Sequence, residues 1–189
     1  MTRRITMILA LALVPPACAA AQEKGKPKAQ RPPLPEGVKA ERDLAYGIHE
    51  KRNTLDLYIP TEGKAPRPLV IWIHGGAWQS GSKDSGPAPA IQLLERGYAV
   101  ACINYRLSQH APFPAQINDC KAAVRFLRAK AAQYGIDPDH LGAWGGSAGG
   151  HLVALLAEKF REVLGTAFLI RSCSPRRRSW QASGRRRLW

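Results

Sequence analysis

A serine between glycines, and a glycine-rich stretch earlier in the chain, are the parts of this sequence that could do chemistry. Residues 145–149 read Gly-Gly-Ser-Ala-Gly, a G-x-S-x-G pattern that can hold Ser147 on a tight strand-to-helix turn. Residues 70–78 are an apolar run that leads directly into His-Gly-Gly-Ala-Trp. A serine hydroxyl that attacks a carbonyl needs a base, and the negative oxygen that forms needs hydrogen-bond donors. Together the two motifs predict a nucleophile and an oxyanion hole.

Backbone N–H groups are the donors expected for that oxyanion. The N–H of Ala148 lies at the start of the helix predicted after Ser147, where the helix dipole favours negative charge. Gly75, Gly76 and Ala77 follow the apolar strand, and small residues leave their N–H groups little obstructed. We therefore predict that the oxyanion hole is built from these four residues.

Two neighbours of the glycines are expected to support them. We predict that His74 holds the glycine-rich stretch by hydrogen bonding and does not act as a base. Trp78 either lines the mouth of the substrate site or packs the stretch itself, and the sequence leaves both roles open.

Hydrophobic periodicity predicts the elements that must position these motifs. Two strands joined by a polar turn are followed by three strand–helix units, which indicates an α/β fold with a doubly wound, mostly parallel sheet. Ligands of such sheets bind at the carboxyl ends of the strands, where both glycine motifs lie. The strands are expected at 43–49, 54–59, 69–73, 98–103 and 141–144, with one more within 163–170; the helices are expected at 88–95, 116–134 and 152–160.

The charge of the chain is concentrated in its two ends. The formal net charge is +14 over 189 residues, yet residues 41–162 hold fourteen Lys/Arg against twelve Asp/Glu. Residues 163–189 hold seven Arg and no acidic residue, and the remaining excess lies in residues 1–40. The core region is therefore nearly neutral, which argues against a specific nucleic-acid partner.

The first residues have the pattern of an export signal. Arg3 and Arg4 precede an apolar stretch over residues 5–14, which is too short to span a bilayer comfortably, and small residues follow. We predict a signal peptide over 1–21, a Lys/Pro-rich linker over 22–40 and export to the periplasm or the extracellular space. Lipid attachment through Cys18 is a weaker alternative, because Pro15 and Pro16 occupy positions where lipoprotein signals prefer Leu and a small residue.

The cysteines show no metal-binding or redox spacing, and no cofactor or metal is predicted. Cys102 lies in an apolar strand and Cys120 on the apolar stripe of a predicted helix, so both are expected to be buried thiols. A disulfide between them is left open.

Several stretches carry a family resemblance. The chain resembles α/β-hydrolase carboxylesterases of the hormone-sensitive-lipase-like and bacterial feruloyl/acetyl-xylan-esterase-like type, from about residue 41 to 161. Ala77-Trp78 in place of two further glycines favours the second branch. The resembling stretches are Leu55-Asp56-Leu57-Tyr58-Ile59-Pro60, His74-Gly75-Gly76-Ala77-Trp78, Asn104-Tyr105-Arg106-Leu107, Phe113-Pro114-Ala115-Gln116 and Gly145-Gly146-Ser147-Ala148-Gly149-Gly150-His151. The resemblance implies Ser147 as nucleophile, donors from Gly76, Ala77 and Ala148, and hydrolysis of a small-molecule or polysaccharide-linked ester through an acyl-enzyme.

The sequence after Ser147 departs from that pattern. Enzymes of this fold place an Asp or Glu and then a His after the serine, each on later elements. Residues 148–189 contain no Asp, and Glu158 and Glu162 fall on or just past the helix that begins at Ala148. His151 lies on that same helix, so we expect it to pack against the sheet.

Of the other histidines, His110 is the one candidate stand-in for a base, because its loop lies at the correct edge of the sheet. His49 lies in the early hairpin, and His140 precedes its strand and belongs at the opposite edge. The Arg-rich tail over 163–189 lacks a core pattern, and we expect the domain to be incomplete at its C-terminus, through a shifted reading frame or a broken gene. Two functions therefore remain open: a serine esterase, or an inactive, ligand-binding remnant of one.

Overall fold

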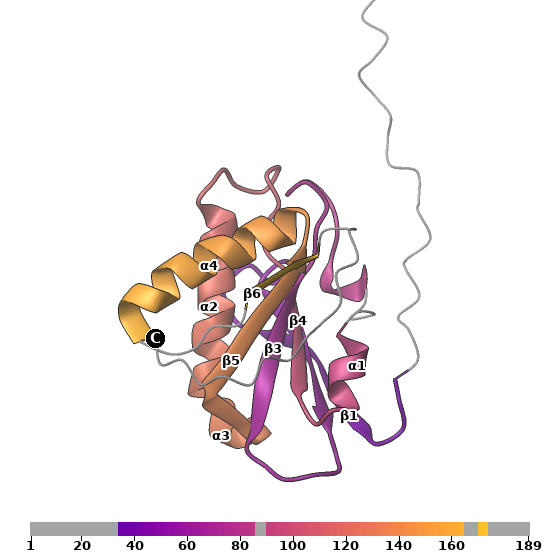
Figure 1. Ribbon diagram of the computed structural model, residues 1–189. Helices are drawn as coiled ribbons and strands as arrows, with labels where there is room; N and C mark the ends of the chain where they lie inside the picture. The colour runs from indigo at the N-terminus through magenta and orange to yellow at the C-terminus, as the bar shows by residue number, and fades with distance from the viewer. Residues whose placement is uncertain (1–33, 86–89, 165–169, 174–189) are drawn as a thin grey trace, which may run out of the picture.

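Six strands in the described part of the chain form one mixed sheet, in the order β1-β2-β4-β3-β5-β6, as the computed structural model shows (Figure 1). The structure describes residues 34–85, 90–164 and 170–173. The strands are β1 (Val38–Ala45), β2 (Thr54–Pro60), β3 (Arg67–Ile73), β4 (Ala99–Ile103), β5 (Ile136–Gly146) and β6 (Ile170–Cys173). The helices are the 3-10 turn η1 (Lys83–Ser85), α1 (Ile91–Leu94), α2 (Ala115–Ala129), α3 (Ala131–Tyr134) and α4 (Ala148–Leu164).

Strand direction follows the predicted fold class. The β1–β2 and β2–β4 pairs are antiparallel, whereas β4, β3, β5 and β6 run parallel to one another. The central strands β3 and β4 are the continuously apolar segments of the sequence, as expected for strands covered on both faces. The prediction of a doubly wound, mostly parallel α/β sheet is confirmed, and the elements described cover part of an α/β-hydrolase fold.

Two apolar clusters lie on opposite faces of the sheet. The larger joins alternate residues of β2, β3 and β4 to α2 and α4, which lie together on one face (Figure 1). The smaller joins the other set of strand residues to α1. Leu69, Ile71 and Ile73 of β3 are fully buried in the larger cluster, and each contributes roughly 1.5–3 kcal/mol to stability.

The two cysteines of the described core separate across the sheet. Cys102 belongs to the smaller cluster and Cys120 to the larger, so the sheet lies between them and they form no disulfide. Both are buried free thiols as predicted, and burial raises the pKa of each above its ordinary value.

The N-terminal hairpin begins earlier than the sequence suggested. The prediction of a strand at 43–49 was wrong, because β1 begins at Val38 and its pairing with β2 is interrupted by a bulge between Glu41 and Leu44. Asp43 in this bulge adopts a left-handed φ of 56°. The last three residues of the predicted linker 22–40 therefore belong to the sheet, since Val38 and Ala40 pack against the smaller cluster.

Three further elements differ from their predicted bounds. Of the helix predicted at 88–95, the structure shows the four residues of α1, and residues 86–89 lie outside the described chain. The helix predicted at 116–134 is divided at Lys130 into α2 and α3, and Gly135 ends it with φ 63°. The strand predicted at 141–144 begins earlier, at Ile136, and the irregular start of β5 shifts its register against β3.

The end of the described chain also corrects a prediction. A strand was expected within 163–170, but residues 163 and 164 are helical, because α4 continues beyond its predicted end at residue 160. The last strand, β6, lies at 170–173 and pairs in parallel with the end of β5. The four residues of β6, which fall in the predicted tail 163–189, thus extend the sheet. The remainder of the predicted tail, and the predicted signal peptide, lie outside the described residues.

Candidate active site

Ser147 lies on a sharp turn between the end of β5 and the start of α4. Its backbone has φ 51°, a left-handed conformation that is rare for a residue with a side chain, and its side chain is exposed. The N–H of His151 donates to the Ser147 carbonyl at 3.1 Å, so α4 begins directly after the serine. A strained non-glycine residue at this position is what a nucleophile elbow requires, because the turn lifts the hydroxyl clear of the sheet.

Steric contacts explain the glycines of this turn. A Cβ built on Gly149 would overlap the carbonyl oxygen of Ile73 and lie 2.7 Å from that of His74. A Cβ on Gly145 would lie 2.5 Å from the carbonyl carbon of Gly149. By contrast, Gly146 has open space around it. The first turn of α4 therefore packs directly on the backbone at the end of β3, and only glycine fits there.

The His-Gly-Gly loop, which we define as residues 74–82, touches this turn. Ile73 pairs with Gly145 in the parallel register of β3 and β5, so both chains leave the sheet at the same point. A Cβ built on Gly75 would lie 2.8 Å from the Gly146 carbonyl oxygen and 3.4 Å from the Ser147 Cβ. The two motifs that the sequence singled out, about seventy residues apart, are thus in van der Waals contact.

The backbone of the His-Gly-Gly loop is coiled in the left-handed region. Gly76, Ala77 and Trp78 have φ values of 114°, 51° and 59°. The Gly76 carbonyl accepts hydrogen bonds from the N–H groups of Gln79 and Ser80, both at 2.9 Å. Within the described residues, the N–H groups of Gly75, Gly76, Ala77 and Ala148 donate no backbone hydrogen bond outside regular elements. This absence of backbone acceptors is compatible with the predicted oxyanion hole.

His74 is a buried, neutral part of the loop. Its Nδ1 lies 2.7 Å from the Gly75 carbonyl oxygen, and its ring stacks on Tyr105 with centroids 4.4 Å apart. Burial lowers the pKa of His74 to about 4, because the charged imidazolium would lose its hydration. At neutral pH the imidazole thus donates to the loop and carries no charge, and no contact joins it to the Ser147 hydroxyl.

Trp78 and His151 meet at the mouth of the site. Their rings contact edge to face with centroids 5.4 Å apart, and Trp78 is 38% exposed. The indole of Trp78 therefore packs against His151 of α4 and leaves part of its surface open to solvent. The expectation that His151 packs against the sheet was wrong, because its side chain is exposed and rests on the indole. An i+4 position places it one turn beyond Ser147, on the side of α4 that faces the loop.

The remaining histidines have partners elsewhere. The Nδ1 of His110 accepts from the N–H of Leu107 at 3.1 Å, which folds this exposed residue back on its own loop. His140 lies in the irregular start of β5, 2.7 Å from Asp137 and at the opposite edge of the sheet from Ser147. His49 is exposed in the β1–β2 turn, and Glu158 is exposed on α4. Within the described chain, no histidine or carboxylate is hydrogen-bonded to the Ser147 hydroxyl.

Residues that the sequence analysis gave no role hold the ends of the loop. Arg52 donates from Nε to the Tyr105 carbonyl at 2.9 Å and from Nη2 to the Gly81 carbonyl at 3.2 Å. Lys83 and Asp56 form a buried ion pair just beyond the loop. Asp56 and Tyr105 lie in stretches that carry the family resemblance, and this was the only signal in the sequence that could have pointed to them. Their contacts join segments far apart in sequence.

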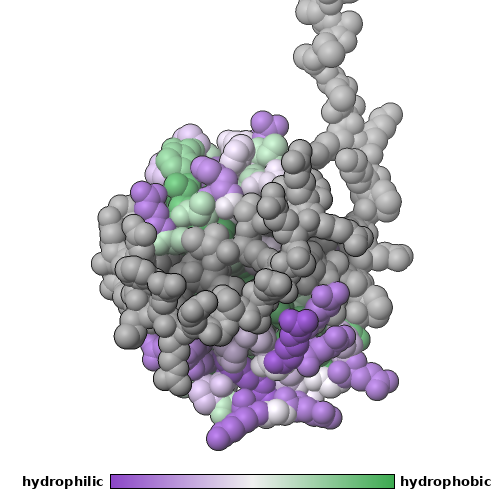
Figure 2. Space-filling model, viewed as in Figure 1, coloured by the Kyte–Doolittle hydropathy of each residue, from purple (hydrophilic) through white to green (hydrophobic). Residues whose placement is uncertain are grey.

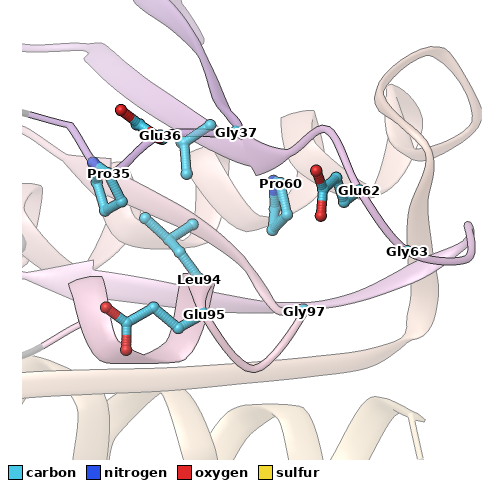
Figure 3. Close-up of a pocket in the computed structure, with 10 residues that line it drawn as sticks. Pro35, Glu36, Gly37, Pro60, Glu62, Gly63, Leu94, Glu95 and Gly97 are labelled. Carbon is cyan, nitrogen blue, oxygen red and sulfur yellow. The ribbon is translucent and has the colours of Figure 1, made fainter.

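A cavity of about 540 Å³ lies at the other edge of the sheet. The close-up shows Leu94 between Pro35 and Pro60, with the carboxylates of Glu36, Glu62 and Glu95 around the rim (Figure 3). It contains no nucleophile or histidine and is formed where β2 ends and β4 begins, away from Ser147. It is therefore separate from the candidate active site.

The two ends of the molecule differ in surface character. Hydrophilic residues gather at the lower end of the view, below the sheet, whereas the upper end is mixed and includes hydrophobic residues (Figure 2). The carboxyl ends of β3 and β5 lie toward this upper end (Figure 1). Large exposed apolar side chains include Trp78 and, on the loop before α2, Phe113, which is 65% exposed. Trp78, which contacts His151 on the first turn of α4, thus gives the surface beside Ser147 a partly exposed aromatic ring.

Among the residues the structure describes, no group of three potential metal ligands occurs. In the same ranges, no helix has the length and apolarity needed to cross a bilayer.

Comparison with known proteins places this geometry in context. A family model described as BD-FAE matches residues 55–167. A probable isoprenylcysteine alpha-carbonyl methylesterase, ICMEL1 of Arabidopsis thaliana, is 39% identical over 113 residues, which are 60% of this chain and 24% of that protein. The chain thus spans about a quarter of the length of this curated relative.

Solved structures agree with the family match. A truncated form of a carbohydrate esterase from gut microbiota is 40% identical, with a TM-score of 0.58, over 64% of this chain and 44% of that one. Esterase B from Lactobacillus rhamnosis is 35% identical, with a TM-score of 0.62, over 72% of this chain and 46% of that one. Both are esterases by name, and each is similar to more than half of this chain.

Proposed function

This chain belongs to the BD-FAE family, and we propose on that premise that it carries the nucleophile and oxyanion hole of a carboxylic ester hydrolase. One observation supports the proposal above all others. The strained, exposed Ser147 lies beside Gly75, and the N–H groups of Gly75, Gly76 and Ala77 donate no backbone hydrogen bond within the described chain. This arrangement supports a nucleophile at Ser147 with an oxyanion hole beside it.

The proposed reaction follows from these positions. The Ser147 Oγ attacks the ester carbonyl carbon, and the carbonyl oxygen gains a negative charge. The N–H groups of Gly76, Ala77 and Ala148 stabilise that charge, each such donor being worth roughly 10²–10³ in rate. The C–O bond to the alcohol then breaks, the alcohol leaves with the serine proton, and water hydrolyses the acyl-enzyme. Both steps require a base to carry the proton.

The surroundings of the Ser147 hydroxyl suggest a second candidate function, because no base contacts it among the described residues. No described histidine hydrogen-bonds the Ser147 hydroxyl, an observation that favours a protein which binds esters or is acylated slowly, without rapid turnover. An oxyanion hole and binding alone can retain part of the rate acceleration when triad members are absent. The family membership favours the esterase; the surroundings of the hydroxyl favour the slow acylation.

Hydrolysis of p-nitrophenyl acetate by the purified chain, with Ser147→Ala as the control, separates the two. For an esterase we expect turnover of roughly 1 s⁻¹ or more that the substitution abolishes. A single stoichiometric release of nitrophenolate, also lost in Ser147→Ala, would identify the slowly acylated protein. Equal hydrolysis by both proteins would reject Ser147 as the nucleophile. Intact mass after reaction with a fluorophosphonate reports independently whether Ser147 is activated.

The substrate class is the finer part of the proposal. The exposed rings of Trp78 and Phe113 near the carboxyl edge support an acyl group that is apolar or aromatic. The solved relative named as a carbohydrate esterase supports a sugar as the alcohol, such as an acetylated or feruloylated polysaccharide. A comparison of kcat/KM for acetyl, butyryl and cinnamoyl esters of one alcohol tests the acyl preference.

We also propose export, with a signal peptide over residues 1–21. The basic pair Arg3-Arg4, the apolar stretch and the small residues that follow support it. Expression of the full chain with a C-terminal tag, followed by N-terminal sequencing, should find cleavage after Ala19 or Ala21. An uncleaved chain in the cytoplasm would contradict the proposal.

A further inference from the structure

A buried lysine stands at the far end of the His-Gly-Gly loop. Lys83 opens the turn η1 directly after residue 82, and only 2% of its side chain is exposed. Buried lysines are rare unless they are paired, because the ammonium group loses its hydration. Its position, nine residues after His74, suggests a task connected with the loop that it ends.

The ammonium group is held by carboxylates of the two N-terminal strands. Its Nζ lies 2.6 Å from the Asp56 Oδ1 of β2 and 2.6 Å from the Asp43 Oδ1 in the bulge of β1. Asp84 lies farther away, at 3.8 Å. The same Asp56 oxygen accepts the N–H of Asp43 at 2.9 Å, and its other oxygen accepts from the Tyr58 hydroxyl at 3.3 Å. Asp56 itself is fully buried, so the pair is fixed from the sheet side.

The backbone of Lys83 is fixed as well. Its N–H donates to Asn104 Oδ1 at 2.7 Å, just beyond the end of β4. The next residue, Tyr105, holds the other end of the loop, because its hydroxyl donates to the His74 carbonyl at 3.0 Å. Adjacent residues after β4 thus clamp the first residue of the loop and the residue that follows its end.

Lys83 contributes more than a backbone amide to this clamp. Ion pairs withdrawn from water generally add little net stability, since desolvation offsets the attraction, but they have strict geometry. Here the pair connects the end of the loop to β1 and β2, two elements that otherwise stand apart from the Ser147 turn. The position of the loop relative to the sheet is therefore defined by a long-range electrostatic contact.

We propose that Lys83 is a positioning residue for the oxyanion hole, acting through the buried pair with Asp56. This proposal rests on the proposed function, because it assigns the amides of Gly76 and Ala77 to the oxyanion. Those amides must lie within a few tenths of an ångström of hydrogen-bond distance from the developing charge. The loop between them and Lys83 is short, so a free end allows them to drift, and a displacement of 1 Å can cost about 10²-fold in rate.

Three variants of the full chain test this assignment. Lys83→Met keeps the length of the side chain and removes its charge, whereas Lys83→Arg keeps the charge. Lys39→Met is the matched control, because Lys39 forms an exposed pair with Glu41 on β1 at 2.8 Å. Two measurements are made on each: hydrogen exchange of the peptide that covers the loop, and kcat and KM for p-nitrophenyl acetate.

In Lys83→Met we expect the amides of the loop to exchange about tenfold faster, while peptides from α2 and β5 stay within about twofold of the wild type. We expect kcat to fall about 10- to 100-fold with KM changed by less than about threefold, because the amides act mainly in the transition state. Lys83→Arg should restore both readouts to within about threefold, and the control should alter neither.

Unchanged hydrogen exchange of the loop peptide in Lys83→Met would overturn the proposal. Hydrogen exchange that is accelerated equally in all peptides would also overturn it, because it would mean that Lys83 has a purely structural role. If Lys83→Met does not fold, the double variant Lys83→Met/Asp56→Asn removes both buried charges, leaves the partly exposed carboxylates of Asp43 and Asp84 to water, and carries the same expectations. A wild type without Ser147-dependent turnover would reject the proposed function, and the exchange measurement alone would then decide whether Lys83 anchors the loop.

Discussion

The Ser147 turn and the His-Gly-Gly loop meet at one point, yet they are held by different forces. The turn is fixed by close packing: Gly145 and Gly149 bring α4 onto the backbone of β3 with no room for a Cβ. The loop is fixed by polar contacts at its ends, through Tyr105 on one side and Lys83 with Asn104 on the other. Steric packing fails abruptly when a volume is added, whereas polar contacts can be removed one at a time.

This difference indicates which half of the site is more adjustable. The turn depends on neighbours within five residues and on one adjacent strand, so its shape belongs to the fold itself. The loop depends on β1, β2 and the residues after β4, and its amides can move if any one anchor is weakened. We therefore expect substitutions at the turn to act on folding, and substitutions at the anchors to act on the geometry of the oxyanion hole.

The largest effect is expected from Gly149→Ala, which breaks the steric half of the comparison. The new Cβ would overlap the Ile73 carbonyl, and because backbone lies on both sides, neither can yield. We expect a loss of about 4 kcal/mol or more in the free energy of unfolding, or no folded protein at all. Gly146→Ala is the matched control, since open space surrounds that residue, and it should cost about 1 kcal/mol or less. Equal losses in urea denaturation would contradict steric control.

A smaller, pH-dependent effect is expected at His74, which belongs to the polar half. Burial lowers its pKa to about 4 from an ordinary value of 6.5, so the unfolded chain binds a proton in this range that the folded chain does not. Stability should therefore fall as the pH falls from about 6.5 to about 4, by about 3 kcal/mol from this residue. His74→Asn should reduce that slope, and His49→Gln, an exposed control, should retain it. Identical slopes in all three proteins would show that His74 is not buried as described.

The smallest effect is expected from Asn104→Ala, which removes one anchor of the loop. The buried N–H of Lys83 would lose its acceptor, an expected cost of about 2 kcal/mol. Asn118→Ala, on the exposed side of α2, should change stability by about 0.5 kcal/mol or less and serves as the control. Chemical denaturation measures both. A cost at Asn104 no greater than at Asn118 would show that the loop does not depend on this contact.

Much of the fold could be predicted from local pattern. The buried strands β3 and β4 and the amphipathic helix α2 follow from apolar runs and from period-3.6 spacing, which depend on neighbours in sequence. The errors lie where distant contacts override local preference. Asp43 adopts a left-handed conformation in β1, where its carboxylate pairs with Lys83. Residues 137–140 belong to β5 although their composition favours a turn.

For the site, the sequence alone determined the two motifs and the edge of the sheet at which they lie. Glycines around a serine specify a sharp turn because the backbone conformation is a local property of those residues. Only the tertiary structure decided that Gly75 touches Ser147, that His151 rests on Trp78 and that Lys83 is buried against Asp56. Such contacts join segments tens of residues apart, and they are fixed by the register of the strands and by the exclusion of water, which no local pattern encodes.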